Sequence, residues 1–198
     1  MFEEQDWSQP VDFAARLAAV PQDAQLRGMF LQVLVDSFPA EIRNKLGARR
    51  YVAFKNYPMR EYVELLAFSA SQARSQKPAD CVRRLGRLIY PNYVKTVSGS
   101  AIFALAGRDY GRVMDAAPVA YKVGVSSASV TVRTVEPCHV HVELRNVFNL
   151  PEFHQVGIWE GAMQVCGATG SIKTRVLDFG AVDFDVRWQN GPSSLRPR

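Results

Sequence analysis

The sequence predicts an α+β fold, with an N-terminal layer of helices packed on an antiparallel sheet, and three observations lead to this prediction. Apolar residues recur with a helical spacing over the first 116 residues, and at every second position afterwards. One further helical segment, residues 151–170, precedes a final hairpin. The 198 residues are 47% hydrophobic, which is enough for one domain with a substantial core. We therefore expect a single domain over residues 1–190 and a loose Pro/Gly/Ser-rich tail over residues 191–198.

The helical layer is predicted from amphipathic segments that prolines and glycines delimit. In the first segment the apolar residues share one face, and Pro39 stops the helix. Pro is favoured in the first turn of a helix, so Pro78 and Pro91 are each expected to begin one, and Gly107 is expected to end the second. The four to six predicted helices include residues 23–38, a short turn near residues 39–47, residues 58–76, the two that begin at Pro78 and Pro91, and a short one before Pro118.

The sheet is predicted where apolar and polar residues alternate, a pattern typical of half-buried strands. The expected strands are residues 118–125, 128–135 and 138–146, joined by turns at Ser126–Ser127 and Glu136–Pro137. An antiparallel meander is the simplest topology for them.

A closing hairpin is predicted over residues 171–188. Val182, Phe184, Val186 and Trp188 share one face of its second strand, and Asp183, Asp185 and Arg187 share the other, which we expect to face solvent. A turn centred near Gly180 would place Arg175 opposite Asp185.

The helix within residues 151–170 has two different faces. One face is apolar, includes Trp159, and is expected to be buried. The other carries Gly157 and Gly161 four residues apart, and each interior glycine destabilises a helix by roughly 1 kcal/mol relative to alanine. The glycines suggest that another backbone or a ligand approaches closely, with Glu160 and Gln164 placed to hydrogen-bond it. A neighbouring helix of the same chain, a dimer contact and a ligand contact are the alternatives.

Aromatic residues are frequent in the helical half, and several carry hydroxyl groups that need partners when buried. Tyr62 and Tyr93 are the candidates that we single out. They could line a cavity for an apolar ligand, or they could be ordinary core residues.

Charge, cysteines and motifs exclude several classes of function. The net charge of +5 is scattered along the chain without a nucleic-acid-binding motif, so we expect no nucleic acid partner. Three widely spaced cysteines without a CxxC pair indicate reduced thiols in a cytoplasmic protein. Neither a signal-peptide pattern nor an apolar run of the ~20 residues that span a bilayer occurs. Because no catalytic motif is present, we expect a protein that is not an enzyme.

Two histidines form the one pattern that is compatible with a metal. His139 and His141 are two residues apart on a predicted strand, so both rings face the same side, with Glu143 next on that side. This spacing could supply zinc ligands. Alternating polar residues also mark the wetter face of a strand; we favour that interpretation and expect no metal.

A family resemblance narrows the function. The segments "GRDYGRVMDAAPVAYK", "VHVELRNVFNLPEFHQVGIWEGAMQVCGA" and "VDFDVRW" resemble a paralogous family of about 200-residue proteins of unknown function that is expanded in myxobacteria. The order of elements is more distantly similar to a superfamily of 4-vinyl reductase (4VR) domains, haem NO-binding domains and Bet3-like trafficking subunits. This resemblance implies a helical layer on a twisted antiparallel sheet, often in a dimer, with an apolar pocket between the layers.

The resemblance also implies what the chain lacks. Relatives that bind haem use a histidine on the helix before the first strands, and the corresponding stretch "DYGRVMDAAPVAYKVG" has none. We therefore expect no haem and no other cofactor. The predicted function is that of a regulatory or sensor-type protein that binds a small apolar ligand between the helical layer and the sheet. The alternative is an interaction or scaffold module that acts through a homodimer interface.

Overall fold

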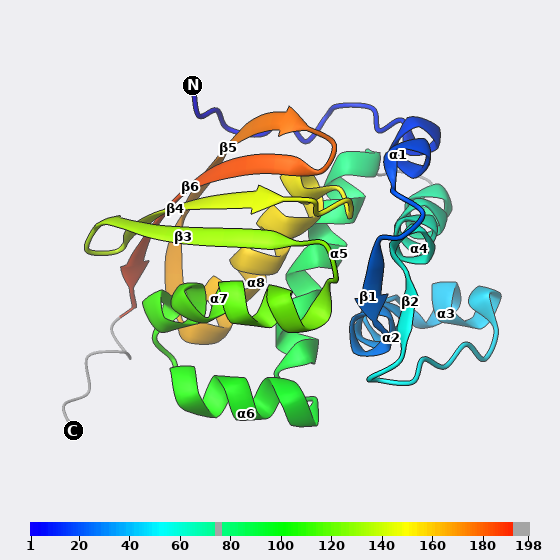
Figure 1. Cartoon of the computed structure of the whole chain (residues 1–198), viewed down its shortest axis with the longest axis horizontal. Helices are drawn as coiled ribbons and strands as arrows, with labels where there is room; N and C mark the ends of the chain where they lie inside the picture. Colours follow the sequence, from blue (N-terminus) through cyan, green and yellow to red (C-terminus); the bar gives the residue numbers. More distant parts are fainter. Residues whose placement is uncertain (74–76, 192–198) are drawn as a thin grey trace.

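The protein folds into a four-stranded antiparallel sheet with helices packed on one face and at one end (Figure 1). The structure is a computed structural model that describes residues 1–73 and 77–191, so the predicted tail lies outside the described residues except for its first residue. The N-terminal elements are α1 (Phe13–Ala19), β1 (Gln25–Arg27), α2 (Gly28–Asp36), α3 (Ala40–Leu46), β2 (Asn56–Pro58), α4 (Met59–Gln72), α5 (Pro78–Tyr93), α6 (Val97–Ala106) and α7 (Tyr110–Gly124).

The C-terminal half forms the sheet and one central helix. Its elements are β3 (Ser129–Glu136), β4 (His139–Arg145), the π-helix η1 (Pro151–Gln155), α8 (Val156–Cys166), β5 (Ala168–Asp178) and β6 (Ala181–Asn190). The predicted α+β class and the order of strands, helix and hairpin are confirmed. Within the described residues, no helix combines the length and the apolar character needed to cross a membrane.

Of the predicted meander, the antiparallel pair β3–β4 remains, because residues 118–124 belong to a helix, and the closing hairpin completes the sheet. The order is β3-β4-β6-β5, so the hairpin's second strand inserts beside β4 and its first strand lies at the edge. The inward face of β6 is apolar, and it packs on α8 through an edge-to-face contact of Trp159 with Phe184, whose ring centroids are 4.5 Å apart. Placing the most apolar strand in the interior of the sheet buries it on both edges. The sheet, α8 and α5 therefore form successive layers (Figure 1).

Helix α8 is buried on two sides, because α5 covers the side opposite the sheet. A Cβ atom added to Gly157 or Gly161 would overlap the backbone carbonyl of Arg83 or Arg87, respectively, on α5. Gly86 of α5 lies equally close to the carbonyl of His154. The close approach that the glycines predicted is thus made by a helix of the same chain.

Helix α7 replaces the first predicted strand. Val119, Tyr121 and Val123 alternate, but they belong to this helix, and Pro118 lies within it. Val119 and Val123 are one turn apart and both are largely exposed, at 65% and 62%. Loss of one backbone hydrogen bond at Pro118 is outweighed by packing of the opposite, alanine-rich side.

Three further expectations are corrected. Pro91 lies inside α5, and the next helix begins at Val97, where the Thr96 side chain accepts a hydrogen bond from Gly99 N. Gly107 ends that helix as predicted.

The predicted first helix begins later, because its first residues form β1 and pair with β2. The predicted helix over residues 58–76 ends at Gln72, and residues 74–76 lie outside the described residues.

The register of the hairpin also differs from the prediction. Arg175 lies opposite Asp183, and Lys173 lies opposite Asp185. A register shift between Val176 and Asp178, next to the turn, accounts for one residue of this difference, and the pairing of Asp178 with Ala181 at the turn accounts for the other. The prediction that Asp183 and Asp185 face solvent is wrong, since their exposed fractions are only 3% and 8%.

Candidate functional site

An apolar cavity of about 120 Å³ lies between α7 and the helices α4, α5 and α8. Helix α7 forms one wall with small residues at helical spacing, and α8 forms the facing wall with larger ones. The lining from these two helices is Val113, Met114, Ala116, Ala117, Ala120 and Tyr121 of α7 and Ile158, Trp159 and Ala162 of α8. Alanines at these positions keep α7 from filling the space with its own side chains, and this produces the cavity.

The polar atoms of the cavity are few and incompletely paired. The Gln155 side chain is fully buried, and the Tyr121 hydroxyl donates a hydrogen bond to its Oε1. Gln155 Nε2 and the Asn149 Oδ1, from two further lining residues, have no hydrogen-bond partner among the described residues. If the Gln155 amide is turned over, Tyr121 accepts from Nε2 instead and Oε1 is left unpaired. One amide atom is unsatisfied in either orientation.

Gln155 is brought to the cavity by the π-helix η1. Its entry residue, Leu150, has φ 57°, in the left-handed region. Single turns of π-helix are frequent at functional sites because they redirect the side chains that follow. Here the turn buries Glu152, His154 and Gln155 in a segment of five residues. Glu152 forms an ion pair with Arg16, and burial nevertheless raises the pKa of Glu152.

His154 is the most isolated polar side chain of this turn. It is fully buried, neither ring nitrogen has a hydrogen-bond partner among the described residues, and its ring packs edge-to-face on Tyr62. Burial lowers the pKa of His154 to about 3, so the ring is neutral at physiological pH.

The cavity is uncharged at neutral pH. Tyrosines 62, 90, 93 and 121 line it, and burial raises the pKa of each hydroxyl. No Asp, Glu, Lys, Arg or His is among the lining residues that the structure describes. The cavity therefore suits an uncharged ligand.

The predicted site residues divide into two groups. Tyr62, Tyr93 and Trp159 all line the cavity. Gly157 and Gly161 instead contact α5, as described above. Between them, Glu160 accepts hydrogen bonds from Arg83 Nε at 2.9 Å and Arg87 Nε at 2.6 Å, and Gln164 is exposed.

Several cavity residues were not singled out from the sequence. Gln155, Asn149 and the alanines of α7 carry no motif, and Tyr121 was assigned to a strand. The signal that could have indicated Gln155 is the occurrence of three polar residues among four positions, Glu152, His154 and Gln155, in an otherwise apolar segment.

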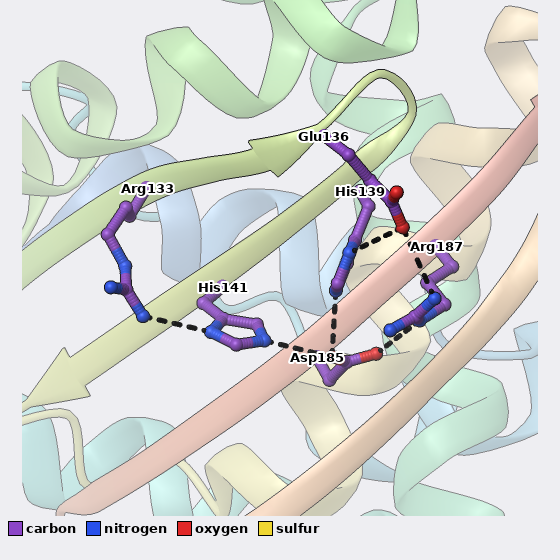
Figure 2. A network of polar contacts seen from close by, with 6 residues as sticks. All are labelled: Arg133, Glu136, His139, His141, Asp185 and Arg187. Atoms are coloured by element: carbon purple, nitrogen blue, oxygen red, sulfur yellow. Dashed lines mark hydrogen bonds and ion pairs between the residues drawn. The ribbon is translucent and has the colours of Figure 1, made fainter.

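A second polar cluster lies on the outer face of the sheet (Figure 2). His139 and His141 of β4 both point their Nε2 atoms at Asp185 of β6. Glu143, the third candidate ligand from the sequence, is exposed and forms an ion pair with Arg145 instead. The structure therefore replaces Glu143 by Asp185.

The comparisons with known proteins give a family and a fold. Residues 19–189 match the family described as "Protein of unknown function (DUF2378)". A search of the curated proteins finds no match. The solved structures that resemble the chain include an H-NOX protein from S. oneidensis in the Fe(II)NO ligation state, with 14% identity, a TM-score of 0.67, and coverage of 83% of this chain and 99% of that one. Fe(II) unliganded H-NOX from K. algicida is 13% identical with a TM-score of 0.62, over 87% of this chain and 100% of that one.

Another similar structure concerns haem redox potential and porphyrin distortion (12% identity, TM-score 0.62, 82% of this chain and 99% of that one). The cavity residues do not fit a haem held through histidine. The three histidines of the chain are absent from the lining, and α7 presents alanines. Among the described lining residues, no cation is present to pair with propionates. The absence of a cofactor stays a prediction.

Proposed function

Because the chain belongs to the DUF2378 family of unknown function and has the fold of H-NOX domains, we propose that it is a sensor-type domain that binds a small, uncharged, largely apolar molecule. The ligand occupies the cavity between α7 and α8. The protein acts by binding, without catalysis of its own.

One observation carries this proposal: the unpaired amide of Gln155 in the wall of an apolar cavity. A buried polar group without a partner destabilises a protein by roughly 1–3 kcal/mol. A ligand that supplies the missing partner removes this penalty on binding. The amide thus gives the ligand both orientation and affinity.

The chemistry of the lining defines the ligand class. Gln155 Nε2 offers a donor and Asn149 Oδ1 offers an acceptor, so the lining can hydrogen-bond an uncharged polar group on the ligand. The remaining contacts are aromatic and aliphatic. Charged ligands are disfavoured because no lining residue that the structure describes compensates a buried charge.

The size of the cavity favours a compact ligand. A volume of about 120 Å³ is below the roughly 300–1,000 Å³ of pockets for drug-sized molecules. It is close to the ~150 Å³ cavity that accepts benzene in an engineered protein core. A single small ring is the expected scale.

The position of α7 supports a sensing role. The side of this helix that carries Ala117 and Ala120 faces the cavity, whereas Val119 and Val123 on the other side are exposed. A ligand that contacts the cavity side of α7 can therefore change the position of this helix, and the exposed side of the helix presents that change to solvent.

Native mass spectrometry tests this function. We expect the protein purified under non-denaturing conditions, or incubated with phenol as a probe, to carry one small molecule per chain. Ala120→Phe fills the cavity and should abolish the adduct. Val119→Phe adds the same ring to the exposed side of the helix and should leave it intact. A wild-type protein that carries no adduct in either condition contradicts the proposal.

The homodimer of the alternative function remains a prediction. Its test is the oligomeric state measured by light scattering over a range of concentrations. A monomer that binds phenol supports the sensor function alone, and a dimer without adduct supports the scaffold.

A further inference from the structure

We propose that the outer face of the sheet holds a binding site for a divalent transition-metal ion, with Zn²⁺ as the probe, formed by His139, His141 and Asp185. This inference is independent of the cavity and of the ligand proposed for it. It revises the sequence-based expectation that the chain binds no metal.

Strand pairing brings the three side chains together. In the register of β4 with β6, His141 lies opposite Asp185, and His139 is two residues earlier on the same face. Asp185 Oδ2 is 2.8 Å from His139 Nε2 and 2.9 Å from His141 Nε2. One ligand atom from each residue lies within 4.8 Å of the others, so a single ion can be contacted by all three (Figure 2).

The donor set is that of a transition metal. Two imidazoles and one carboxylate are ligands that suit zinc and iron, whereas oxygen-only sets suit magnesium and calcium. Three protein ligands also leave at least one coordination position for water or an external ligand.

Neighbouring groups orient two of the ligands from outside. Glu136 Oε1 lies 3.2 Å from His139 Nδ1 and holds the proton on that nitrogen, which directs the lone pair of Nε2 toward Asp185. Arg187 Nε donates to Asp185 Oδ1 at 3.0 Å, which leaves Oδ2 to face the two rings. Metal-binding histidines commonly carry such a carboxylate partner.

This tautomer places two metal-binding atoms together. With the proton of His139 on Nδ1, the lone pairs of Nε2 and of Asp185 Oδ2 face each other at 2.8 Å. A metal ion at this place can accept both lone pairs.

Arg133 stabilises the tautomer of His141 that cannot coordinate a metal through Nε2. Its Nη2 lies 3.1 Å from His141 Nδ1, and a guanidinium only donates, so His141 Nδ1 accepts and Nε2 carries the proton. Metal coordination by Nε2 requires the other tautomer. Arg133 is exposed and is free to turn outward when His141 Nδ1 becomes a donor. Removal of this arginine should therefore strengthen metal binding.

The site is protected but reachable. The side chains of His139 and Asp185 are 5% and 11% exposed, and that of His141 is 26% exposed. The Phe2 ring covers part of His141, with centroids 5.2 Å apart. Solvent and ions therefore enter on the His141 side.

The test is a titration of the tag-free, full-length protein with Zn²⁺ in a calorimeter, with Co²⁺ absorption as a report of ligand type. We expect one ion per chain. Asp185→Asn and His141→Gln should each weaken binding at least tenfold, whereas Glu143→Gln, an exposed carboxylate of β4, should leave it unchanged. Arg133→Gln supplies an acceptor for His141 Nδ1 and should tighten binding.

Two outcomes would overturn the proposal. One is the absence of Zn²⁺ binding by the folded wild-type protein. The other is binding that survives both His141→Gln and Asp185→Asn, because that ion is held elsewhere, for example by the cysteine thiols. Circular dichroism of each variant establishes that it is folded.

Discussion

The turn η1 and the outer face of the sheet both bury polar side chains, but they pair them differently. At η1 and the adjoining cavity, His154 and one amide atom of Gln155 have no hydrogen-bond partner among the described residues. On the outer sheet face, Asp183 is bound by Arg145 and Arg175, and Asp185 is bound by two histidines and Arg187. Incomplete pairing marks a place where a ligand adds a missing contact. Nearly complete pairing, as at Asp183, marks a place where the chain itself supplies the charges.

The largest loss of folding stability is expected at the contact between α5 and α8. Gly161→Ala would put a Cβ into the backbone of α5, and overpacking of this kind destabilises proteins by about 3 kcal/mol. Gln164→Ala, on the exposed side of the same helix, should change the free energy of unfolding by less than ~0.5 kcal/mol. Urea denaturation of both variants measures the difference. Equal stabilities would show that the α5–α8 contact is loose.

A smaller loss is expected on the outer sheet face. Burial alone would raise the pKa of Asp183, but hydrogen bonds from Arg175 and Arg145 outweigh it and lower the pKa. Asp183→Asn should reduce stability at pH 7 by about 1–2 kcal/mol, since both arginines are partly exposed. Because the folded pKa is depressed, this contribution is present above pH ~4 and is lost as the pH falls through the folded pKa.

Glu143→Gln is the matched control for that variant. Glu143 lies directly opposite Asp183 in the strand pairing but is exposed. Its substitution should change the free energy of unfolding by less than ~0.5 kcal/mol, both at pH 7 and below pH ~4. If both variants lose the same amount, the outer face does not depend on the buried pairing.

The unpaired imidazole of His154 should make the free energy of unfolding depend on pH. Its pKa is about 3 in the folded protein, against an ordinary value of 6.5, so between these values the unfolded chain binds a proton that the folded chain does not. Stability therefore falls as the pH decreases through this window. The contribution is roughly 1 kcal/mol per pH unit well below pH 6.5.

The variant that isolates this effect is His154→Phe, which keeps a ring against Tyr62. Thermal unfolding between pH 7 and pH 5 should show a flatter stability profile for the variant than for the wild type. Identical slopes would mean that His154 is protonated or hydrogen-bonded in the folded protein.

The smallest change in stability is expected at Gln155. Gln155→Leu removes the unpaired amide but also removes the partner of the Tyr121 hydroxyl, so the two effects largely cancel. The free energy of unfolding should change by less than ~1 kcal/mol. A loss above ~2 kcal/mol would show that Gln155 is already satisfied and that the contrast with the outer face is wrong.

The periodicity of the sequence was sufficient to predict the fold class. Apolar and polar residues alternate in 130–133, 139–145 and 182–188 as they do in strands, and the glycine pair of α8 predicted a close backbone contact. Single-sequence patterns did not distinguish the strand predicted over residues 118–125 from α7, because Val119 and Val123 fit either period. Ala116, Ala117 and Ala120 lie on the cavity side of α7, and the alternation of the valines gives no sign of that helical face.

Side-chain contacts that depend on strand pairing could not be predicted from the sequence either. His139 and His141 were identified from their spacing, but their third partner was taken to be Glu143, the next residue on the same strand face. Asp185 takes that place because β6 pairs with β4, and no pattern within either strand predicts that pairing. Gln155 and Tyr121 meet across 34 residues of sequence, which no local pattern records.

The most direct test of the ligand-binding cavity is calorimetric titration of the wild type and Ala120→Phe with phenol. We expect one phenol to bind per wild-type chain and none to bind to Ala120→Phe, which remains folded. Binding of equal strength to both proteins would place the phenol outside the cavity, and no binding to either would contradict the sensor function.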